Sequence, residues 1–224
     1  MLEEKVVNLT VDRSAAQYIA VIEKAYVAFV SDRIGKHYLI DSAIKPLEPT
    51  DRLCGIAVTS LGTDLTVRRA AIDTMEAGDV LVVAAGGSSD WTCFGDGTAQ
   101  KIVARGGIAA VIDGCTRDSP GLVRMGFPTF CRGATAKNYY YPHAIKAGGV
   151  NVPVSIGNVS INPGDIVFGD RDGVVAIPRA LAPRIAELVS ADLEAERTLR
   201  AGVGPGFRSN AHDELVANGY VIRG

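Results

Sequence analysis

Residues 78–87 read GDVLVVAAGG: a turn, an unbroken apolar run and a pair of glycines. An apolar run of this length between turn signals is typical of a strand that is buried on both faces. Strands and helices alternate around it, with further strands expected at 53–60, 108–112 and 128–131 and helices at 64–77 and 97–105. This order predicts an α/β fold.

The two ends of the chain add different patterns. Residues 15–30 carry apolar side chains at helical spacing, which predicts a helix packed on the core. Short β segments are expected at 152–156, 159–161, 165–168 and 174–177, and a long amphipathic helix at 180–201. We therefore expect a single domain over residues 1–224, with an N-terminal helical segment at 1–40 and a β-rich second half.

Composition excludes several classes of protein. Hydrophobic residues make up 47% of the chain, which excludes intrinsic disorder. The 23 Lys and Arg residues against 25 Asp and Glu give a net charge of −2, which argues against nucleic acid as a partner. No apolar run approaches the roughly 20 residues of a membrane helix, and no secretory signal pattern is visible. The four cysteines form no C-x-x-C pair, so we expect reduced thiols in a cytoplasmic protein.

A glycine-rich loop follows the central strand. Residues 86–98 read GGSSDWTCFGDGT and lead into the helix expected at 97–105. Free backbone N–H groups at a helix start form an anion site, although a plain turn with a helix N-cap explains the same residues equally well. The loop matches neither the Walker A pattern nor G-x-G-x-x-G, so a nucleotide is not indicated.

A second polar stretch, IDGCTRD at residues 112–118, follows the next strand. Ligands of open α/β sheets gather at the carboxyl ends of strands, and Arg117 is suited to a planar carboxylate. A salt bridge between Arg117 and Asp118 is the competing and commoner interpretation of this pair. Because the two strand ends are expected side by side, Asp96 and Asp118 are expected to face one cleft. Two carboxylates with an arginine, and no His or Cys cluster, suit Mg²⁺ or Mn²⁺.

These residues resemble those of a known family. Asp96, twenty intervening residues, then Arg117-Asp118 match the D-x20-R-D pattern of the 4-hydroxy-4-methyl-2-oxoglutarate/4-carboxy-4-hydroxy-2-oxoadipate aldolases of the RraA-like superfamily. The similarity extends over residues 40 to 205 and includes the glycine loop, AAVIDG at 109–114 and GDRDGVVAIP at 169–178. Several matched segments in the same order are more specific than one Arg-Asp pair.

The resemblance implies a class II pyruvate aldolase that depends on Mg²⁺ or Mn²⁺ and cleaves 4-hydroxy-2-oxo acids. Decarboxylation of oxaloacetate gives the same pyruvate enolate, so we expect it as a second activity. It implies that Asp118 binds the metal and that Asp96 holds a metal-bound water. Arg117 would contact the 2-oxo acid end of the substrate, whose carboxylate would be received by the backbone amides of Gly97 and Thr98. The implied catalytic set is Arg117, Asp96 and Asp118, and the implied substrate-binding set is Arg117, Gly95, Gly97 and Thr98.

The resemblance also implies a β-rich α/β/α layered sandwich of the swivelling β/β/α type, assembled as trimers or pairs of trimers with the site at a subunit interface. The family uses a glutamate from the neighbouring subunit's C-terminal helix, expected here at 180–205, and the candidates are Asp192, Glu194 and Glu196. A solvated helix face explains each of these three residues as well.

One position departs from the family pattern. Many relatives carry an acidic residue three positions after the metal aspartate, and this chain has Gly121 there, preceded by Pro120. We expect the water network of this loop or the selection of substrate to differ.

Other functions and sites remain open. The main alternative is a non-catalytic regulator like RraA that binds an RNA-degrading enzyme; such proteins lack the metal aspartate, so Asp118 favours catalysis. A class I aldolase would need a desolvated lysine, for which Lys45 and Lys101 are the nearest options. His37 and His143 are candidate acid or base groups but are more often surface or packing residues.

Two further groups of side chains have ordinary structural explanations. The tyrosine run at 139–141 would line a pocket mouth or, more commonly, a subunit contact. Cys93 and Cys115 flank the two motifs without a clear base partner, so inert thiols are expected.

Overall fold

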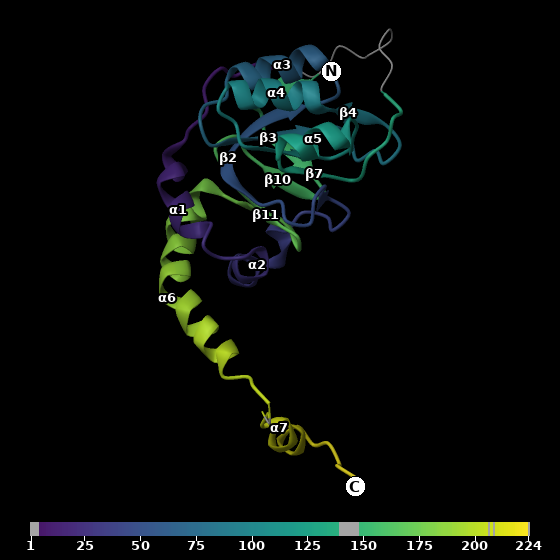
Figure 1. Ribbon diagram of the computed structural model, residues 1–224. Coiled ribbons are helices and arrows are strands. Elements are labelled where there is room, and N and C mark those ends of the chain that lie inside the picture. Colours follow the sequence, from purple (N-terminus) through teal and green to yellow (C-terminus); the bar gives the residue numbers. More distant parts are fainter. Residues whose placement is uncertain (1–4, 139–147, 206, 208, 224) are drawn as a thin grey trace. The chain divides into compact units, whose positions relative to one another are not determined.

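The computed structural model describes residues 5–138, 148–205, 207 and 209–223 (Figure 1). The chain divides into two compact units, Met1–Val189 and Ser190–Gly224. The second unit contains the end of helix α6 (Ala182–Ala201) and helix α7 (Ala211–Ala217). The prediction of a single domain over residues 1–224 stays a prediction.

An eight-stranded sheet forms the centre of the first unit, in the order β1-β7-β5-β3-β2-β11-β12 with β8 beside β2. The strands are β1 (Lys45–Pro46), β2 (Leu53–Leu61), β3 (Asp79–Ala84), β5 (Ala109–Ile112), β7 (Thr129–Cys131), β8 (Gly149–Val150), β11 (Ile166–Asp170) and β12 (Gly173–Ile177). β2, β3, β5 and β7 pair in parallel, and the other pairings are antiparallel. The alternation of strands and helices expected from the sequence is confirmed.

The two edges of this sheet are joined by residues 39–46. Ile40 N–H donates to the carbonyl of Val174 in β12, at 2.9 Å, and a few residues later β1 pairs with β7. Lys45 Nζ also donates to the carbonyl of Asp172, at 2.7 Å. The sheet is therefore nearly closed, like a barrel.

Side chains that alternate along the strands divide the core into two layers. Val80 and Val82 of β3 pack with the hairpin of β9 (Val154–Ile156) and β10 (Val159–Ile161). Leu81 and Val83 pack with a helical layer formed by α3 (Leu65–Asp73), α4 (Asp96–Ala104) and α5 (Ser119–Met125) (Figure 1). This alternation places helices on one face of the sheet and a β hairpin on the other. The predicted α/β class and its β/β/α layering are confirmed.

The N-terminal segment is helical but interrupted, which corrects the prediction of one helix over 15–30. It forms η1 (Ser14–Tyr18), α1 (Ile19–Ile22), α2 (Val27–Ile34) and η2 (Lys36–Tyr38). Tyr26 has an extended backbone, with φ −130° and ψ 159°. The N–H of Val27 donates to Oδ2 of Asp170 at 2.8 Å, so a carboxylate from β11 satisfies the first turn of α2.

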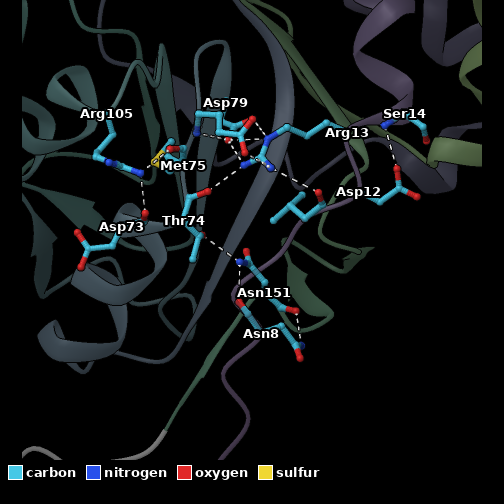
Figure 2. A network of polar contacts seen from close by, with 12 residues as sticks. Asn8, Asp12, Arg13, Ser14, Asp73, Thr74, Met75, Asp79, Arg105 and Asn151 are labelled. Atoms are coloured by element: carbon cyan, nitrogen blue, oxygen red, sulfur yellow. Dashed lines mark hydrogen bonds and ion pairs between the residues drawn. The ribbon is translucent and has the colours of Figure 1, made fainter.

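A polar network fastens residues 8–13 to the first unit (Figure 2). Arg13 Nη2 lies 2.8 Å from Oδ2 of the buried Asp79 and donates to the Thr74 carbonyl at 2.9 Å. Asn151 Nδ2 donates to the Thr74 hydroxyl at 3.0 Å and to the Asn8 carbonyl at 2.9 Å. The predicted helix over 64–77 accordingly ends at Asp73, because residue 74 is held by this network.

The C-terminal helix begins later than expected, at Ala182 after the short helix η3 (Arg179–Leu181). Among the described residues, no helix has both the length and the apolar character needed to cross a membrane.

Candidate active site

A short parallel pair of strands, which the sequence did not indicate, brings the two polar motifs together. β4 (Thr92–Phe94) pairs with β6 (Cys115–Thr116). At the end of this pair the N–H of Arg117 donates to the carbonyl of Phe94 at 2.9 Å. Gly95-Asp96 and Arg117-Asp118 therefore leave neighbouring strand ends together, as predicted for one cleft.

The glycine loop opens helix α4. Gly95 is the N-cap residue, with an extended backbone, and Asp96 is the first helical residue. The N–H of Thr98 donates to the Gly95 carbonyl at 2.9 Å. Within the described part of the chain, the N–H groups of Asp96 and Gly97 have no such partner. These two amides, with the positive end of the helix dipole, are the groups that can receive an anion. The expected pair was Gly97 and Thr98, but the Thr98 amide is already bonded to Gly95, so Asp96 takes its place.

Asp118 sits in a special backbone conformation beside this helix start. Its φ of 56° and ψ of 29° place it in the left-handed region, directly before α5. Its carboxylate lies over Gly95, because a Cβ on that glycine would be 2.6 Å from Asp118 Oδ2. Arg117 Nε donates to the same Oδ2 at 3.1 Å. The commoner interpretation of the Arg-Asp pair is thus also present, as a half-exposed ion pair.

The structure explains why residue 121 is a glycine. A Cβ added to Gly121 would overlap the carboxylate of Asp96, whose Oδ2 occupies that space. Because residue 121 has no side chain, the Asp96 carboxylate can lie against helix α5.

These motifs surround one cavity of about 310 Å³. Three cationic side chains (Arg68, Lys101 and Arg117) and two carboxylates (Asp96 and Asp118) take part in its lining. The remaining lining residues are Thr63, Leu65, Thr92, Cys93, Phe94, Gly95, Gly97, Thr98 and Asn138. Every predicted residue of the catalytic and substrate-binding sets thus lines this cavity.

Arg68 is a cavity residue that the sequence reasoning missed. It is only 3% exposed, and its Nη1 donates to the Cys93 carbonyl of β4. A signal was present, since Leu65, Arg68, Ala71, Ile72 and Met75 follow the spacing of a buried helix face. An arginine on a buried helix face is unusual, because charged side chains are rarely buried, so Arg68 could have been singled out from the sequence.

The lysine, histidine and tyrosine candidates differ in whether they lie at the cavity. Lys101 lines the cavity, whereas Lys45 bonds the Asp172 carbonyl at the joined sheet edges. The His37 ring packs against Tyr38, with centroids 4.1 Å apart. His143 and the tyrosine run at 139–141 lie outside the described residues.

Both flanking cysteines have environments typical of inert thiols. Burial raises the pKa of the Cys93 and Cys115 thiols above its usual value. Cys115 Sγ is also a hydrogen-bond donor to the Ser89 carbonyl at 3.2 Å. A neutral thiol is a poor nucleophile, so neither cysteine fits a covalent mechanism.

The acidic candidates of the C-terminal helix belong to the second unit. Glu196 pairs with Arg200 at 2.7 Å, and Glu194 lies 3.7 Å from Arg197. Together with Asp192, they stay predicted contributors to a neighbouring subunit's site.

The donor set of the cavity suits a hard divalent cation. Within the described residues, no group of three or more His, Cys, Asp or Glu side chains is gathered as a complete cage. Mg²⁺ does not require such a cage, because it keeps several waters and commonly uses one or two carboxylates together with substrate oxygens. Asp118 and Asp96 on the wall of an open cavity match that requirement.

The chain is similar to known proteins in both sequence and fold. The model of the RraA-like family, described as Aldolase/RraA, matches residues 27–176. A protein of Halalkalibacterium halodurans named "Putative 4-hydroxy-4-methyl-2-oxoglutarate aldolase" is 35% identical over 153 residues, which are 67% of this chain and 71% of the relative.

Two solved structures are similar to this chain in fold. Streptomyces coelicolor RraAS2, described as an unusual member of the RNase ES inhibitor RraA protein family, has a TM-score of 0.71 at 27% identity, covering 84% of this chain and 98% of the other. An uncharacterized protein from Pseudomonas syringae pv. tomato has a TM-score of 0.72 at 26% identity, covering 86% and 94%.

Proposed function

The chain belongs to the Aldolase/RraA family, and from this premise we propose that it is a divalent-metal-dependent pyruvate aldolase acting on 4-hydroxy-2-oxo acids. The observation that carries the proposal is that Asp96, Arg117 and Asp118 line one cavity at the start of α4. The reaction cleaves the bond between C3 and C4 and releases pyruvate and a carbonyl product.

Binding of the 2-oxo acid end follows from the helix start. The substrate carboxylate is received by the free amides of Asp96 and Gly97, while the bonded N–H of Thr98 keeps the turn in place. Gly97 leaves this approach open, because a Cβ there would meet nothing within 4 Å.

Arg117 stabilises the charge that develops during cleavage. Breaking the C3–C4 bond leaves pyruvate as its enolate, with negative charge on the former ketone oxygen. A fixed guanidinium at that oxygen contributes about 3 kcal/mol if it acts as a typical oxyanion donor. The ion pair with Asp118 holds the Arg117 side chain toward the cavity before substrate binds.

Asp118 and Asp96 are the residues that would hold Mg²⁺ or Mn²⁺. When bound, the cation acts as a Lewis acid toward the ketone and carboxylate oxygens of the substrate. The C4 hydroxyl must lose its proton as the carbonyl product forms. The Asp96 carboxylate, placed against Gly121, accepts that proton through a water molecule, and protonation of the enolate at C3 then gives pyruvate. Decarboxylation of oxaloacetate gives the same enolate, so it is proposed as a second activity.

The proposed setting of this site follows the family. We propose a cytoplasmic homo-oligomer, a trimer or a pair of trimers, whose C-terminal helix offers an acidic side chain to the neighbouring site. The second candidate function is a non-catalytic regulator, favoured by the likeness to RraAS2, which is described as belonging to a family of RNase ES inhibitors. Asp118 beside Arg117 argues for the aldolase.

Pyruvate release tests the two functions. Purified protein is given oxaloacetate and a series of 4-hydroxy-2-oxo acids with Mg²⁺, Mn²⁺ or EDTA, and the background without protein is subtracted. We expect turnover that needs the metal and that is abolished by Asp118→Ala, with Asp172→Ala as an exposed-carboxylate control. Metal-dependent turnover of none of these acids would contradict the proposal and favour the regulator.

A further inference from the structure

A second, smaller cavity adjoins the candidate active site. Its volume is about 60 Å³, and it shares Thr63, Thr92 and Cys93 with the lining of the larger cavity. The rest of its lining consists of Ala85, Ser88, Trp91 and Gly114. These lining residues are all uncharged, in contrast to the arginines, lysine and carboxylates of the larger cavity. Since one water molecule needs roughly 10–15 Å³ of such space, the small cavity can hold a group of a few heavy atoms.

Polar atoms of this lining are bonded within the chain. The Thr92 hydroxyl donates to the Phe94 carbonyl at 3.0 Å. The Ser88 hydroxyl accepts the N–H of Trp91 at 3.3 Å. Burial raises the pKa of the Cys93 thiol, and a neutral thiol packs like a small hydrophobic group. The small cavity therefore offers apolar surface to a ligand.

Trp91 forms one wall of the small cavity and is 45% exposed. Its backbone is held by Ser88, and its ring lies 5.6 Å from Nζ of Lys137, which pairs with Asp90 at 2.7 Å. A large aromatic side chain that is held in place and open to solvent gains free energy when an apolar group of a ligand covers it.

Strand β4 connects the two cavities. Thr92 and Cys93 line both of them, and Gly95 follows the strand at the start of α4. At about 3.3 Å per residue, Cys93 lies roughly 7 Å from Gly95. A chain of about five carbon–carbon bonds of about 1.5 Å each spans that distance. A 2-oxo acid that is held by its carboxylate at α4 and extends along β4 thus places the carbon atoms beyond C4 beside the small cavity.

We propose that the small cavity binds a short alkyl group of the substrate beyond C4 and that Trp91 is the specificity-determining residue. The preferred substrates are then 4-hydroxy-2-oxo acids that carry an alkyl chain in place of a second carboxylate. Cleavage breaks the C3–C4 bond. The C4 hydroxyl loses its proton and becomes the carbonyl of an aliphatic aldehyde, and protonation of C3 gives pyruvate. This inference rests on the proposed function for the identity of the substrate.

A series of probes that cannot be cleaved tests the small cavity. Pyruvate, 2-oxobutanoate, 2-oxopentanoate and 2-oxohexanoate share the 2-oxo acid end and grow by one CH₂ at a time. 2-Oxoglutarate has the length of 2-oxopentanoate but ends in a carboxylate. Binding to the full chain with Mg²⁺ is measured by calorimetry. Trp91 is the single tryptophan of the chain, so its fluorescence reports on the small cavity independently of turnover.

Two variants alter the small cavity at residues that are not among those lining the larger one. Gly114→Ala narrows it, because the new Cβ would lie 3.4 Å from Cβ of Ala85 and 3.5 Å from Sγ of Cys93, in ordinary contact. Trp91→Ala removes one wall. Gly204→Ala is the matched control, because a Cβ on that glycine meets nothing within 4 Å.

We expect the affinity of the wild type and of Gly204→Ala to rise about fourfold with each CH₂ from 2-oxobutanoate to 2-oxohexanoate. The emission of Trp91 shifts to shorter wavelength with 2-oxohexanoate and not with pyruvate. In Gly114→Ala and Trp91→Ala the rise falls below about twofold per CH₂, while the affinity for pyruvate stays within about twofold. 2-Oxoglutarate binds more weakly than 2-oxopentanoate, because its second carboxylate loses hydration in an uncharged cavity.

Equal affinity across the alkyl series in the wild type would overturn the inference, and so would tighter binding of 2-oxoglutarate than of 2-oxopentanoate. A rise with chain length that persists in both cavity variants would place the alkyl group elsewhere and would also overturn it. If Gly114→Ala does not fold, Trp91→Ala decides alone, since it changes a half-exposed side chain. Failure of the aldolase proposal is separately visible as chain-length selectivity without turnover of any 4-hydroxy-2-oxo acid.

Discussion

Two arginines of the first unit, Arg13 and Arg68, differ in how their guanidinium groups are satisfied. Nε and Nη2 of Arg13 donate to Asp79, Nη2 also to the Thr74 carbonyl, and Nη1 lies 3.0 Å from Glu76 (Figure 2). Hydrogen bonding to Asp79 raises the pKa of Arg13 above its usual value. Arg68 is more deeply buried, and within the described residues its guanidinium makes one hydrogen bond, to the Cys93 carbonyl.

Buried charged groups of this protein are thus of two kinds: some stabilise the fold, and others are able to bind a ligand. A buried ion pair with all its donors used stabilises a fixed arrangement, and removing one partner is costly. A buried or half-buried charge with unused donors or lone pairs can instead bind a substrate or a cation. Asp79 is of the first kind, whereas Arg117 and Asp118 at the cavity are of the second. Substitutions at the cavity should therefore lower activity, and substitutions in the Arg13 network should lower stability.

The largest effect is expected on activity, for Arg117→Ala. Loss of the guanidinium removes a fixed charge from the enolate oxygen, so kcat/KM for pyruvate release falls roughly 10²–10³-fold. The free energy of unfolding, from urea denaturation, changes by less than about 1 kcal/mol, because the pair with Asp118 is half exposed. Near-normal kinetics in this variant would place the reacting centre elsewhere.

The network around Arg13 is expected to give the opposite result. Asp79→Ala leaves the Arg13 guanidinium without its main partner and should lower the free energy of unfolding by about 3 kcal/mol. Turnover per folded molecule stays at the wild-type level below the melting transition. Glu76→Ala is the matched control, since its carboxylate is 66% exposed and its loss costs little. Reduced turnover in fully folded Asp79→Ala would contradict this, because it would show that the Arg13 network also supports the active site.

Gly121→Ala is expected to give an intermediate effect. The new methyl group would overlap the Asp96 carboxylate, and this flexible side chain would move aside. Misplacing a proton-directing group should lower kcat about tenfold, with little change in thermal midpoint. Val123→Ala, on the exposed part of α5, is the control for the helix itself. Wild-type kinetics for Gly121→Ala would show that the position of Asp96 is not critical.

The smallest effect is expected on stability at high pH, from the buried thiol of Cys54. Burial raises the pKa of the Cys54 thiol from 9.0 to about 12. Since the unfolded chain loses this proton first, stability is full below pH 9 and falls as the pH rises toward 12. The loss is about 1 kcal/mol per pH unit. Urea denaturation between pH 8.5 and 10.5 should give a steeper decline for the wild type than for Cys54→Ala, and parallel curves would refute this.

The fold was largely predictable because its strands are strongly patterned. The apolar runs at 53–60 and 80–85 correspond to β2 and β3. The segments expected at 152–156, 159–161, 165–168 and 174–177 correspond to β9, β10, β11 and β12. The break at Tyr26 was not predictable, because it depends on Asp170, 143 residues away from Val27. Local periodicity contains no information about such a distant cap.

The two polar motifs that line the cavity were visible in the sequence, but Arg68 and the strand pair that joins the motifs were not. Arg117 and Asp118 follow from the spacing of the motif, yet β4 and β6 are too short to stand out in sequence. Helix α5 begins at Ser119, directly after the left-handed Asp118, and Pro120 in its first turn is a helix-start signal that the sequence contains. The closeness of Gly121 to Asp96 and the orphaned donors of Arg68 are properties of packing alone.

Binding of Mn²⁺ by the full chain, followed by electron paramagnetic resonance, tests the central claim most directly. The wild type should bind one Mn²⁺ per chain, and Asp118→Ala should bind it at least 100-fold more weakly. Asp172→Ala, which removes an exposed carboxylate, should match the wild type. Equal Mn²⁺ binding by the wild type and Asp118→Ala would contradict the account, because the carboxylate would then serve only to neutralise Arg117.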